Sequence, residues 1–313
     1  FELLGRAPER LRDAHPRVRV EIVDDADAFA ARLPSADAVI VSGFPIPPSA
    51  LAPGGRLRWI QSVHVGVDDL LTPALRAADH VALTASKGPM ATAIAEHALM
   101  LTLALARDLP RFLADQAARR WVHWAERPPM VQLRGKTVLI LGVGELGGAL
   151  ARLCKALGMR VIGMTRRSRG HPHVDRYVAR GELHAALAEA DVVVLTMPAT
   201  GETAGLLDRT ALGAMKPSAY LINVARGKLV DEEALIEALR AGQIAGAGLD
   251  AVATEPLAPD SPLWALPNVI ITPHLAPITD AVADDLVAFW AENVHRFAEG
   301  EPLRGLVDRA AGY

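Results

Sequence analysis

The chain has 313 residues, of which 51% are hydrophobic and 22% are charged, a balance typical of folded globular proteins with buried cores. Its 33 basic and 36 acidic residues give a formal charge of −3, which provides no electrostatic attraction for nucleic acid or for an acidic membrane surface. The single cysteine, Cys154, excludes an internal disulfide and a cysteine-based metal cluster. One cysteine is also compatible with a reducing compartment, so we expect a cytoplasmic protein without a metal.

The N-terminal part of the chain contains short apolar runs that are typical of buried strands. They lie at Val18–Val23, Ala38–Val41, Leu57–Gln61 and Val81–Thr84, and a helix is predicted before them over Gly5–Ala14. Helical or loop stretches separate these runs. The pattern indicates a small parallel α/β unit.

A long apolar helix is predicted next, over Thr92–Arg107, and Pro110 is expected to close it. The apolar stretch within it falls far short of the ~20 residues that a membrane span needs, so we expect no membrane association. The following segment contains Trp121 and Trp124 together with two prolines. We interpret it as an irregular arm.

A second series of strands and helices begins after the arm. Strands that alternate with helices predict a parallel sheet with helices on both faces. The predicted strands are Thr137–Leu141, Arg160–Met164, Asp191–Thr196, Ala219–Val224, Ala247–Leu249 and Val269–Thr272, and the clearest helices are Glu145–Leu157, Asp231–Ala241 and Asp280–Ala298.

A glycine-rich turn follows the first strand of this series. Gly142-Val-Gly144-Glu145-Leu146-Gly147 lies between a strand and a helix, and a second strand follows, which is the context that a dinucleotide-binding turn requires. Gly142 permits the tight turn, Gly144 lets the backbone approach a pyrophosphate, and Gly147 allows close packing of helix on strand. The start of the helix attracts the anion. The alternative is a tight turn that binds nothing.

The end of the second strand indicates which dinucleotide is bound. An acidic residue there would accept hydrogen bonds from the adenosine ribose of NAD. The strand ends instead in Thr165-Arg166-Arg167-Ser168, and guanidinium groups pair well with phosphate. We therefore expect NADP as the preferred cofactor, with NAD as an alternative. The competing interpretation is a solvated basic turn.

Three residues that suit one reaction follow three later strands. Arg226, Glu255 and His274 each lie just beyond a predicted strand, at the sheet edge where open α/β sheets bind ligands. Histidine can supply a proton to a carbonyl oxygen, and a nearby carboxylate favours its charged form. Arginine can hold a substrate carboxylate. Together they predict hydride transfer to a 2-oxo acid, although each residue taken alone has an ordinary structural interpretation.

The chain resembles the D-isomer specific 2-hydroxyacid dehydrogenases, particularly glyoxylate and hydroxypyruvate reductases. The resembling segments are residues 133–144, 222–231, 248–256 and 272–275, with weaker similarity at 62–68 and 94–97. The resemblance implies that Arg226, Glu255 and His274 are the catalytic residues, with His274 as general acid and base.

The resemblance also implies two Rossmann-like or flavodoxin-like parallel-sheet domains, doubly wound, with the active site in a cleft between them. The substrate domain would comprise residues 1–91 and 280–313, and the cofactor domain residues 92–279. A dimer arm is expected near residues 110–133. Members are commonly dimers, and a tryptophan of the arm could reach the partner's pocket or simply pack in the interface.

The remaining site residues come partly from the resemblance and partly from the motifs described above, and Lys87 is added for its place near the expected pocket. Backbone N–H groups of Val65 and Gly66 would bind the substrate carboxylate beside Arg226, and Lys87 would assist an acidic substrate unless it is merely solvated. His64 stands where the family often has glycine, and the sequence leaves the identity of the 2-hydroxy acid open. The expected cofactor-binding residues are Gly142, Gly144, Glu145, Leu146, Gly147, Thr165, Arg166, Arg167, Ser168, Met197, Pro198, Val224, Ala225, Asp250, His274 and Ala276.

Two other functions stay open at this point. One is a phosphoglycerate-type dehydrogenase within the same class. The other is a nucleotide-sensing protein similar to transcriptional corepressors that share this fold. A sensor would bind the dinucleotide without oxidising it at a useful rate.

Overall fold

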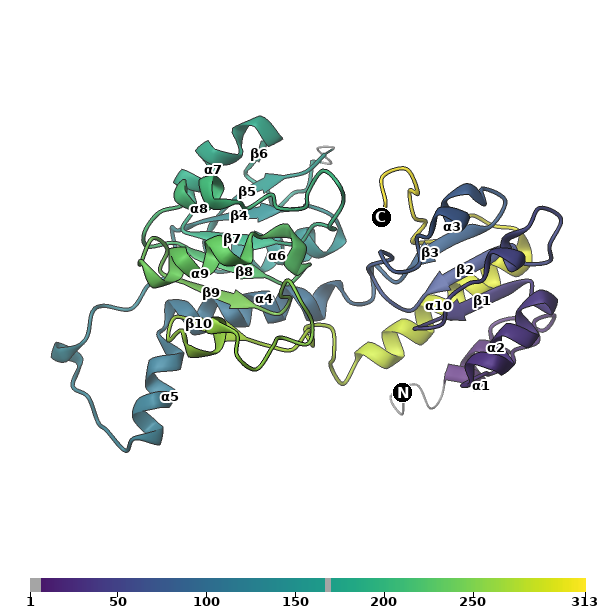
Figure 1. Ribbon diagram of the computed structural model, residues 1–313, viewed down its shortest axis with the longest axis horizontal. Helices are drawn as coiled ribbons and strands as arrows, with labels where there is room; N and C mark the ends of the chain where they lie inside the picture. The colour runs from purple at the N-terminus through teal and green to yellow at the C-terminus, as the bar shows by residue number, and fades with distance from the viewer. Residues whose placement is uncertain (1–6, 167–169) are drawn as a thin grey trace. The chain divides into compact units, whose positions relative to one another are not determined.

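The computed structural model describes residues 7–166 and 170–313. The chain divides into two compact units (Figure 1). Unit 1 comprises Phe1–Met90 and Thr279–Tyr313, and unit 2 comprises Ala91–Ile278. Among the described residues, no helix combines the length and the apolar character needed to cross a membrane.

Unit 1 contains a parallel three-stranded sheet in the order β1-β2-β3. The strands are β1 (Ala38–Val41), β2 (Trp59–Ser62) and β3 (Ala82–Ala85). The end of the chain adds backbone hydrogen bonds to β3, since Ala85 N–H donates to Gly305 O at 2.9 Å and Val307 N–H donates to Leu83 O at 2.9 Å. The helices and 3-10 turns of unit 1 are α1 (Ala7–Asp13), α2 (Ala26–Arg32), η2 (Leu33–Ser35), η3 (Pro48–Leu51), α3 (Pro73–Ala77) and α10 (Val282–Glu299).

The strand predicted over Val18–Val23 is wrong, because the structure has no strand there. The alternation of apolar and charged residues was misleading. A strand needs a paired neighbour and a buried face, yet Ile22 is 60% exposed. Alternation of apolar residues alone therefore does not determine the secondary structure of this segment.

Unit 2 contains a parallel seven-stranded sheet in the order β10-β9-β8-β7-β4-β5-β6. Chain order runs outward from β4 to one edge and then returns to the other side of β4, which makes the sheet doubly wound. Two parallel sheets confirm the predicted α/β class. The strands are β4 (Thr137–Leu141), β5 (Arg160–Met164), β6 (Arg176–Val178), β7 (Val192–Leu195), β8 (Tyr220–Asn223), β9 (Gly246–Leu249) and β10 (Val269–Ile271).

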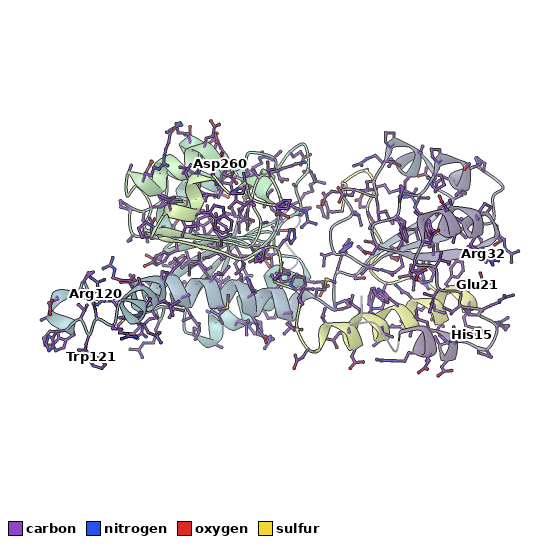
Figure 2. The ribbon with its side chains drawn as sticks, turned by 60° about the horizontal axis from the view of Figure 1, so that its bottom comes forward. His15, Glu21, Arg32, Arg120, Trp121 and Asp260 are labelled. Atoms are coloured by element: carbon purple, nitrogen blue, oxygen red, sulfur yellow. The ribbon has the colours of Figure 1, made fainter. Side chains whose placement is uncertain are left out.

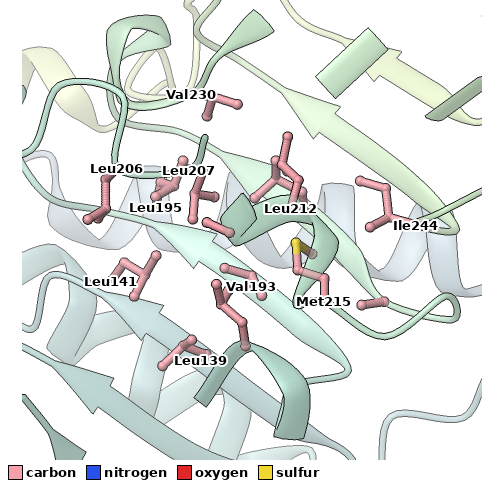
Figure 3. Packing of buried hydrophobic residues seen from close by; sticks show 14 of the residues in the cluster. Leu139, Leu141, Val193, Leu195, Leu206, Leu207, Leu212, Met215, Val230 and Ile244 are labelled. Carbon is pink, nitrogen blue, oxygen red and sulfur yellow. The ribbon is translucent and has the colours of Figure 1, made fainter. Parts of the chain in front are cut away.

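Helices cover this sheet and form its core with the strands. Every residue of β4 and β7 is buried, because both faces of the sheet are covered. Figure 3 shows Leu139 and Leu141 beside Val193 and Leu195 in this core. Each buried leucine contributes about 1.5–3 kcal/mol of hydrophobic free energy. The helices and 3-10 turns are α4 (Ala91–Ala106), α5 (Leu109–Ala117), η4 (Trp124–Glu126), α6 (Glu145–Ala156), η5 (Arg180–Glu182), α7 (Leu183–Glu189), α8 (Arg209–Gly213), η6 (Gly227–Leu229), α9 (Glu232–Arg240) and η7 (Pro262–Ala265).

The arm, residues 110–133, is less irregular than the sequence indicates, because it contains most of α5. Pro110 lies in the first turn of α5, where a missing N–H is tolerated, so it opens a helix there. Figure 2 shows Trp121 near the tip of the arm, and its side chain is 97% exposed. Arg127 returns to α5, where it pairs with Asp115 and lies 5.1 Å above the ring of Phe112.

Candidate active site

The glycine-rich turn lies at the carboxyl end of β4. Gly142 has a φ of +114°, and a Cβ there would lie 2.7 Å from the backbone nitrogen of Met197, so a larger residue would not fit. A Cβ on Gly147 would overlap the carbonyl of Gly142. Both glycines are therefore needed for close packing between β4, α6 and the segment after β7.

Gly144 differs from these two glycines because a Cβ there would meet nothing within 4 Å. It is the residue immediately before α6, and no side chain caps the helix there. The uncapped N–H groups at the start of a 12-residue helix favour an anion. Glu145 and Leu146 form the first turn behind them. This open backbone surface fits the pyrophosphate of a dinucleotide.

Arg166 follows the end of β5, and it pairs with a carboxylate from a distant turn. The Nη2 atom of Arg166 lies 2.6 Å from Oε2 of Glu202, which belongs to the turn after β7. Thr165 before it is half-buried. The predicted residues Arg167 and Ser168 lie outside the described residues.

Met197 and Pro198 follow β7, which pairs with β4 on the side opposite β5. The hydroxyl of Thr196 donates to the carbonyl of Gly142 at 2.7 Å, and the hydroxyl of Thr203 donates to the carbonyl of Pro198 at 2.7 Å. The first bond holds the segment after β7 against the end of β4, and the second fixes the turn within that segment. Met197, one of the predicted cofactor-binding residues, therefore borders the turn.

Asn223, the last residue of β8, connects the turn that carries Arg226 to the turn after β9. Its buried side chain accepts a hydrogen bond from Ala225 N–H at 3.1 Å and donates to the carbonyls of Arg226 at 3.0 Å and Ala251 at 3.3 Å. A Cβ on Gly227 would overlap the carbonyl of Val252, so the two turns lie in direct contact. The guanidinium of Arg226 donates to the carbonyl of Ala225 at 2.7 Å.

Glu255 and His274 form a hydrogen-bonded pair at the same sheet edge. The Nδ1 atom of His274 lies 2.7 Å from Oε2 of Glu255, while Oε1 of Glu255 accepts from Val252 N–H at 3.2 Å. Their side chains are 40% and 38% exposed, so the imidazole is open to a ligand. With Nδ1 directed to the carboxylate, Nε2 remains for proton transfer.

Asp250, the residue after β9, is almost fully buried. Its carboxylate accepts hydrogen bonds from the Thr272 hydroxyl at 2.6 Å, Leu275 N–H at 3.0 Å and Ala276 N–H at 3.1 Å. Val224 and Ala225, two of the predicted cofactor-binding residues, are buried immediately after β8. The carboxylate of Asp250 therefore organises the turn that carries His274.

The substrate-binding residues predicted outside unit 2 follow strands of unit 1. Val65 and Gly66 are half-buried residues in the loop after β2. The imidazole Nε2 of His64 lies 2.9 Å from the hydroxyl of Ser42, which follows β1. The amine of Lys87, after β3, donates to the carbonyl of Leu306 at 3.2 Å. The carboxyl edge of the smaller sheet thus presents polar side chains.

Cys154 is a residue that the site does not use. It lies on the buried face of α6, and burial raises the pKa of its thiol to about 12. The thiol is therefore protonated near neutral pH and is not a nucleophile. Among the described residues, no group of three or more histidine, cysteine, aspartate or glutamate side chains could hold a metal ion.

Comparison with known proteins places this geometry in context. A family model described as D-isomer specific 2-hydroxyacid dehydrogenase, NAD binding domain, matches residues 99–276. The D-3-phosphoglycerate dehydrogenase of Mycobacterium tuberculosis is 35% identical over 98% of this chain, which spans only 58% of that protein's length.

Two solved structures illustrate the cofactors found in this fold. One is the NADPH-dependent glyoxylate/hydroxypyruvate reductase of Sinorhizobium meliloti, in complex with NADP and sulfate. It is 30% identical to this chain, the match covers 100% of this chain and 96% of the reductase chain, and the TM-score is 0.83. A D-isomer specific 2-hydroxyacid dehydrogenase of Lactobacillus delbrueckii, in an NAD-complexed form, is 26% identical, covers 98% of both chains and gives a TM-score of 0.82.

Proposed function

The chain belongs to the D-isomer specific 2-hydroxyacid dehydrogenases, and from this we propose that it reduces a small 2-oxo acid, such as glyoxylate or hydroxypyruvate, with NADPH. The observation that carries the proposal is the hydrogen-bonded pair of His274 and Glu255. The side chain of Asn223 links the turn after β9, which leads to Glu255, to the turn that carries Arg226. The open backbone at Gly144 lies at the carboxyl edge of the same sheet.

The proposed catalytic residues are Arg226, Glu255 and His274. When bound, the reduced nicotinamide supplies a hydride to the carbonyl carbon of the substrate. His274 donates a proton from Nε2 to the carbonyl oxygen, which prevents a full negative charge from developing there. Glu255 accepts a hydrogen bond from Nδ1 and stabilises the protonated ring beforehand. Arg226 pairs with the substrate carboxylate and orients the carbonyl.

We propose that unit 2 binds the cofactor and that unit 1 binds the substrate. In unit 1, Val65 and Gly66 would donate backbone N–H groups to the substrate carboxylate, and Lys87 would favour an acidic substrate. We also propose that the enzyme forms a homodimer through the arm and that it is cytoplasmic. The exposed Trp121 and Trp124 support the homodimer, because they offer apolar surface to a second copy.

The preference for NADPH rests on Arg166. Its guanidinium lies just after β5, at the position where this fold contacts the ribose, and it already pairs with the carboxylate of Glu202. A 2′-phosphate would replace that carboxylate as the partner of Arg166. The solved S. meliloti reductase contains NADP, which supports NADPH as the preferred cofactor. The solved L. delbrueckii relative contains NAD, so NAD is the alternative cofactor.

A phosphoglycerate-type dehydrogenase is the second candidate, and its support is the 35% identity to the M. tuberculosis enzyme. Steady-state turnover of a panel of 2-oxo acids, each with NADH and with NADPH, separates the candidates. We expect the highest kcat/KM with glyoxylate or hydroxypyruvate and NADPH. Preference for the phosphorylated 2-oxo acid would favour the second candidate. Tight NADPH binding without turnover of any acid would instead favour a corepressor-like sensor.

A further inference from the structure

The turn that carries His274 has a backbone conformation that needs external support. His274 has a φ of +54°, in the left-handed region that residues with a side chain rarely adopt. Such a conformation persists when surrounding contacts hold the backbone in place. The position of the imidazole therefore depends on whatever fixes this turn.

Asp250, the residue after β9, provides part of that support. Its backbone carbonyl accepts a hydrogen bond from His274 N–H at 2.9 Å. Its carboxylate accepts bonds from the hydroxyl of Thr272, before His274, and from the N–H groups of Leu275 and Ala276, after it. The turn is thus held on both sides of the histidine by one buried carboxylate.

His97 supplies a further contact from a different element, helix α4. Its Nε2 atom lies 2.9 Å from the hydroxyl oxygen of Thr272 and 3.5 Å from Oδ1 of Asp250, and its side chain is only 16% exposed. A carboxylate accepts hydrogen bonds, so the hydroxyl of Thr272 donates to Asp250 at 2.6 Å. Nε2 of His97 must then carry the hydrogen and donate to Thr272.

The packing of α4 fixes where His97 lies. Leu101 is one helical turn further along α4, and a Cβ on Gly248 of β9 would lie only 2.9 Å from the Cβ of Leu101. The absence of a side chain at Gly248 therefore lets α4 approach β9 closely. This approach brings His97, on the same face of the helix, to the end of the sheet.

We propose that His97 is a positioning residue for His274, acting through Thr272 and the carboxylate of Asp250. The inference rests on the proposed function, because it assigns His97 to the machinery of that same site. His97 does not take the proton of the reaction. It orders the hydrogen-bond network that keeps Nε2 of His274 in one orientation.

Three variants test this role. His97→Leu removes the donor at similar volume, whereas His97→Gln retains an N–H donor at the end of the side chain. His184→Leu, on the exposed surface of α7, is the matched control for the same substitution on a helix of unit 2. Measurements are kcat and KM for a 2-oxo acid, NADPH affinity by fluorescence, thermal unfolding, and the ring nitrogen chemical shifts of the histidines.

We expect kcat of His97→Leu to fall about tenfold, since small displacements of a catalytic group are costly. KM and NADPH affinity should stay within about twofold of the wild-type values, because binding contacts are retained. His97→Gln should recover most of kcat, and His184→Leu should behave as the wild-type protein. The nitrogen shifts of His274 should change in His97→Leu and not in the control.

Two outcomes would overturn the inference. One is wild-type kcat in His97→Leu with unchanged His274 shifts. The other is an equal loss of kcat and of thermal stability in both His97 variants, which would show a general structural role. If the wild-type protein reduces no 2-oxo acid, the proposed function fails, but the nitrogen shifts still decide whether His97 controls the environment of His274.

Discussion

His274 and Glu255 meet through a 2.7 Å contact between Nδ1 and Oε2, although each residue belongs to a different turn. Glu255 follows β9 and His274 follows β10, and these two strands are neighbours in the parallel sheet. The pairing directs Nε2 of the imidazole away from the carboxylate. A proton on that nitrogen is then available to a substrate.

Glu255→Gln removes the negative charge that stabilises the protonated imidazole. The carboxylate also accepts the hydrogen bond from Nδ1 that orients the ring, so proton donation from Nε2 should become less efficient. We expect kcat/KM for the 2-oxo acid to be roughly tenfold lower than in the wild-type protein, since partial exposure weakens the pair. Steady-state kinetics measure the effect.

Glu232→Gln is the matched control, because Glu232 accepts from Ala253 N–H at 2.8 Å in the same region. It should leave kcat/KM unchanged. Equal kcat/KM for the wild-type protein and Glu255→Gln would show that the pair has no part in proton transfer.

Arg226→Lys keeps the positive charge but loses the planar fork of donors. We expect a higher KM for the 2-oxo acid and a lower kcat, with kcat/KM reduced about tenfold or more. NADPH affinity should be unchanged. Arg240→Lys, on the exposed end of α9, controls for the substitution itself. Kinetics equal to those of the wild-type protein would remove Arg226 from the mechanism.

Arg166→Ala tests the choice of cofactor. Loss of a charge-assisted contact to the 2′-phosphate should raise KM for NADPH roughly tenfold and leave KM for NADH nearly unchanged. Arg176→Ala is the control, because Arg176 pairs with Glu189 in the same way on the edge strand β6. A wild-type protein that uses NADH better than NADPH at equal concentration would contradict this assignment.

Asp175→Asn tests a contact that supports β5. Hydrogen bonds from the Lys155 amine and from Val161 N–H hold the pKa of the Asp175 carboxyl below its ordinary value of 3.8. A lowered pKa stabilises the folded state above the ordinary value, and that contribution is lost as pH falls through the folded-state value. At pH 7 the variant should lose about 0.5–1 kcal/mol, since the pair is largely exposed.

This difference from the wild-type protein should shrink below about pH 4. Urea unfolding at both pH values measures it. Asp260→Asn, in an exposed loop of unit 2 (Figure 2), should leave stability unchanged at either pH. A deficit of Asp175→Asn that is the same at both pH values would mean that the charge of Asp175 is not the source of stabilisation.

The central strands of unit 2 were predictable because their burial is complete. The strands at Thr137–Leu141 and Arg160–Met164 have the predicted bounds. A short edge strand such as β6 gives almost no sequence signal, since only three residues pair with one neighbour. Apolar and charged residues alternate at Val18–Val23, which predicts a strand, but the structure provides no neighbouring strand for this segment to pair with.

The polar residues at the strand ends were predictable from their places in the motifs, whereas residues that act from a distance were not. Glu202 reaches Arg166 from a turn 36 residues further along the chain. His97 lies within a mainly apolar helix and meets Thr272 only because α4 packs closely on β9. Both contacts depend on tertiary packing, so no local pattern identifies the partner residue. The sequence did mark His97, because the resembling segment 94–97 contains it and it lies four residues before the buried Leu101.

The most direct test of the proposed reaction follows one atom. NADPH that carries deuterium at its transferable nicotinamide position is incubated with the protein and glyoxylate or hydroxypyruvate, and the product is analysed by mass spectrometry. The proposal predicts deuterium on the hydroxyl-bearing carbon of the 2-hydroxy acid with the wild-type protein, and at least about a hundredfold less product with His274→Gln. Bound NADPH without labelled product, or equal labelling by both proteins, would contradict it.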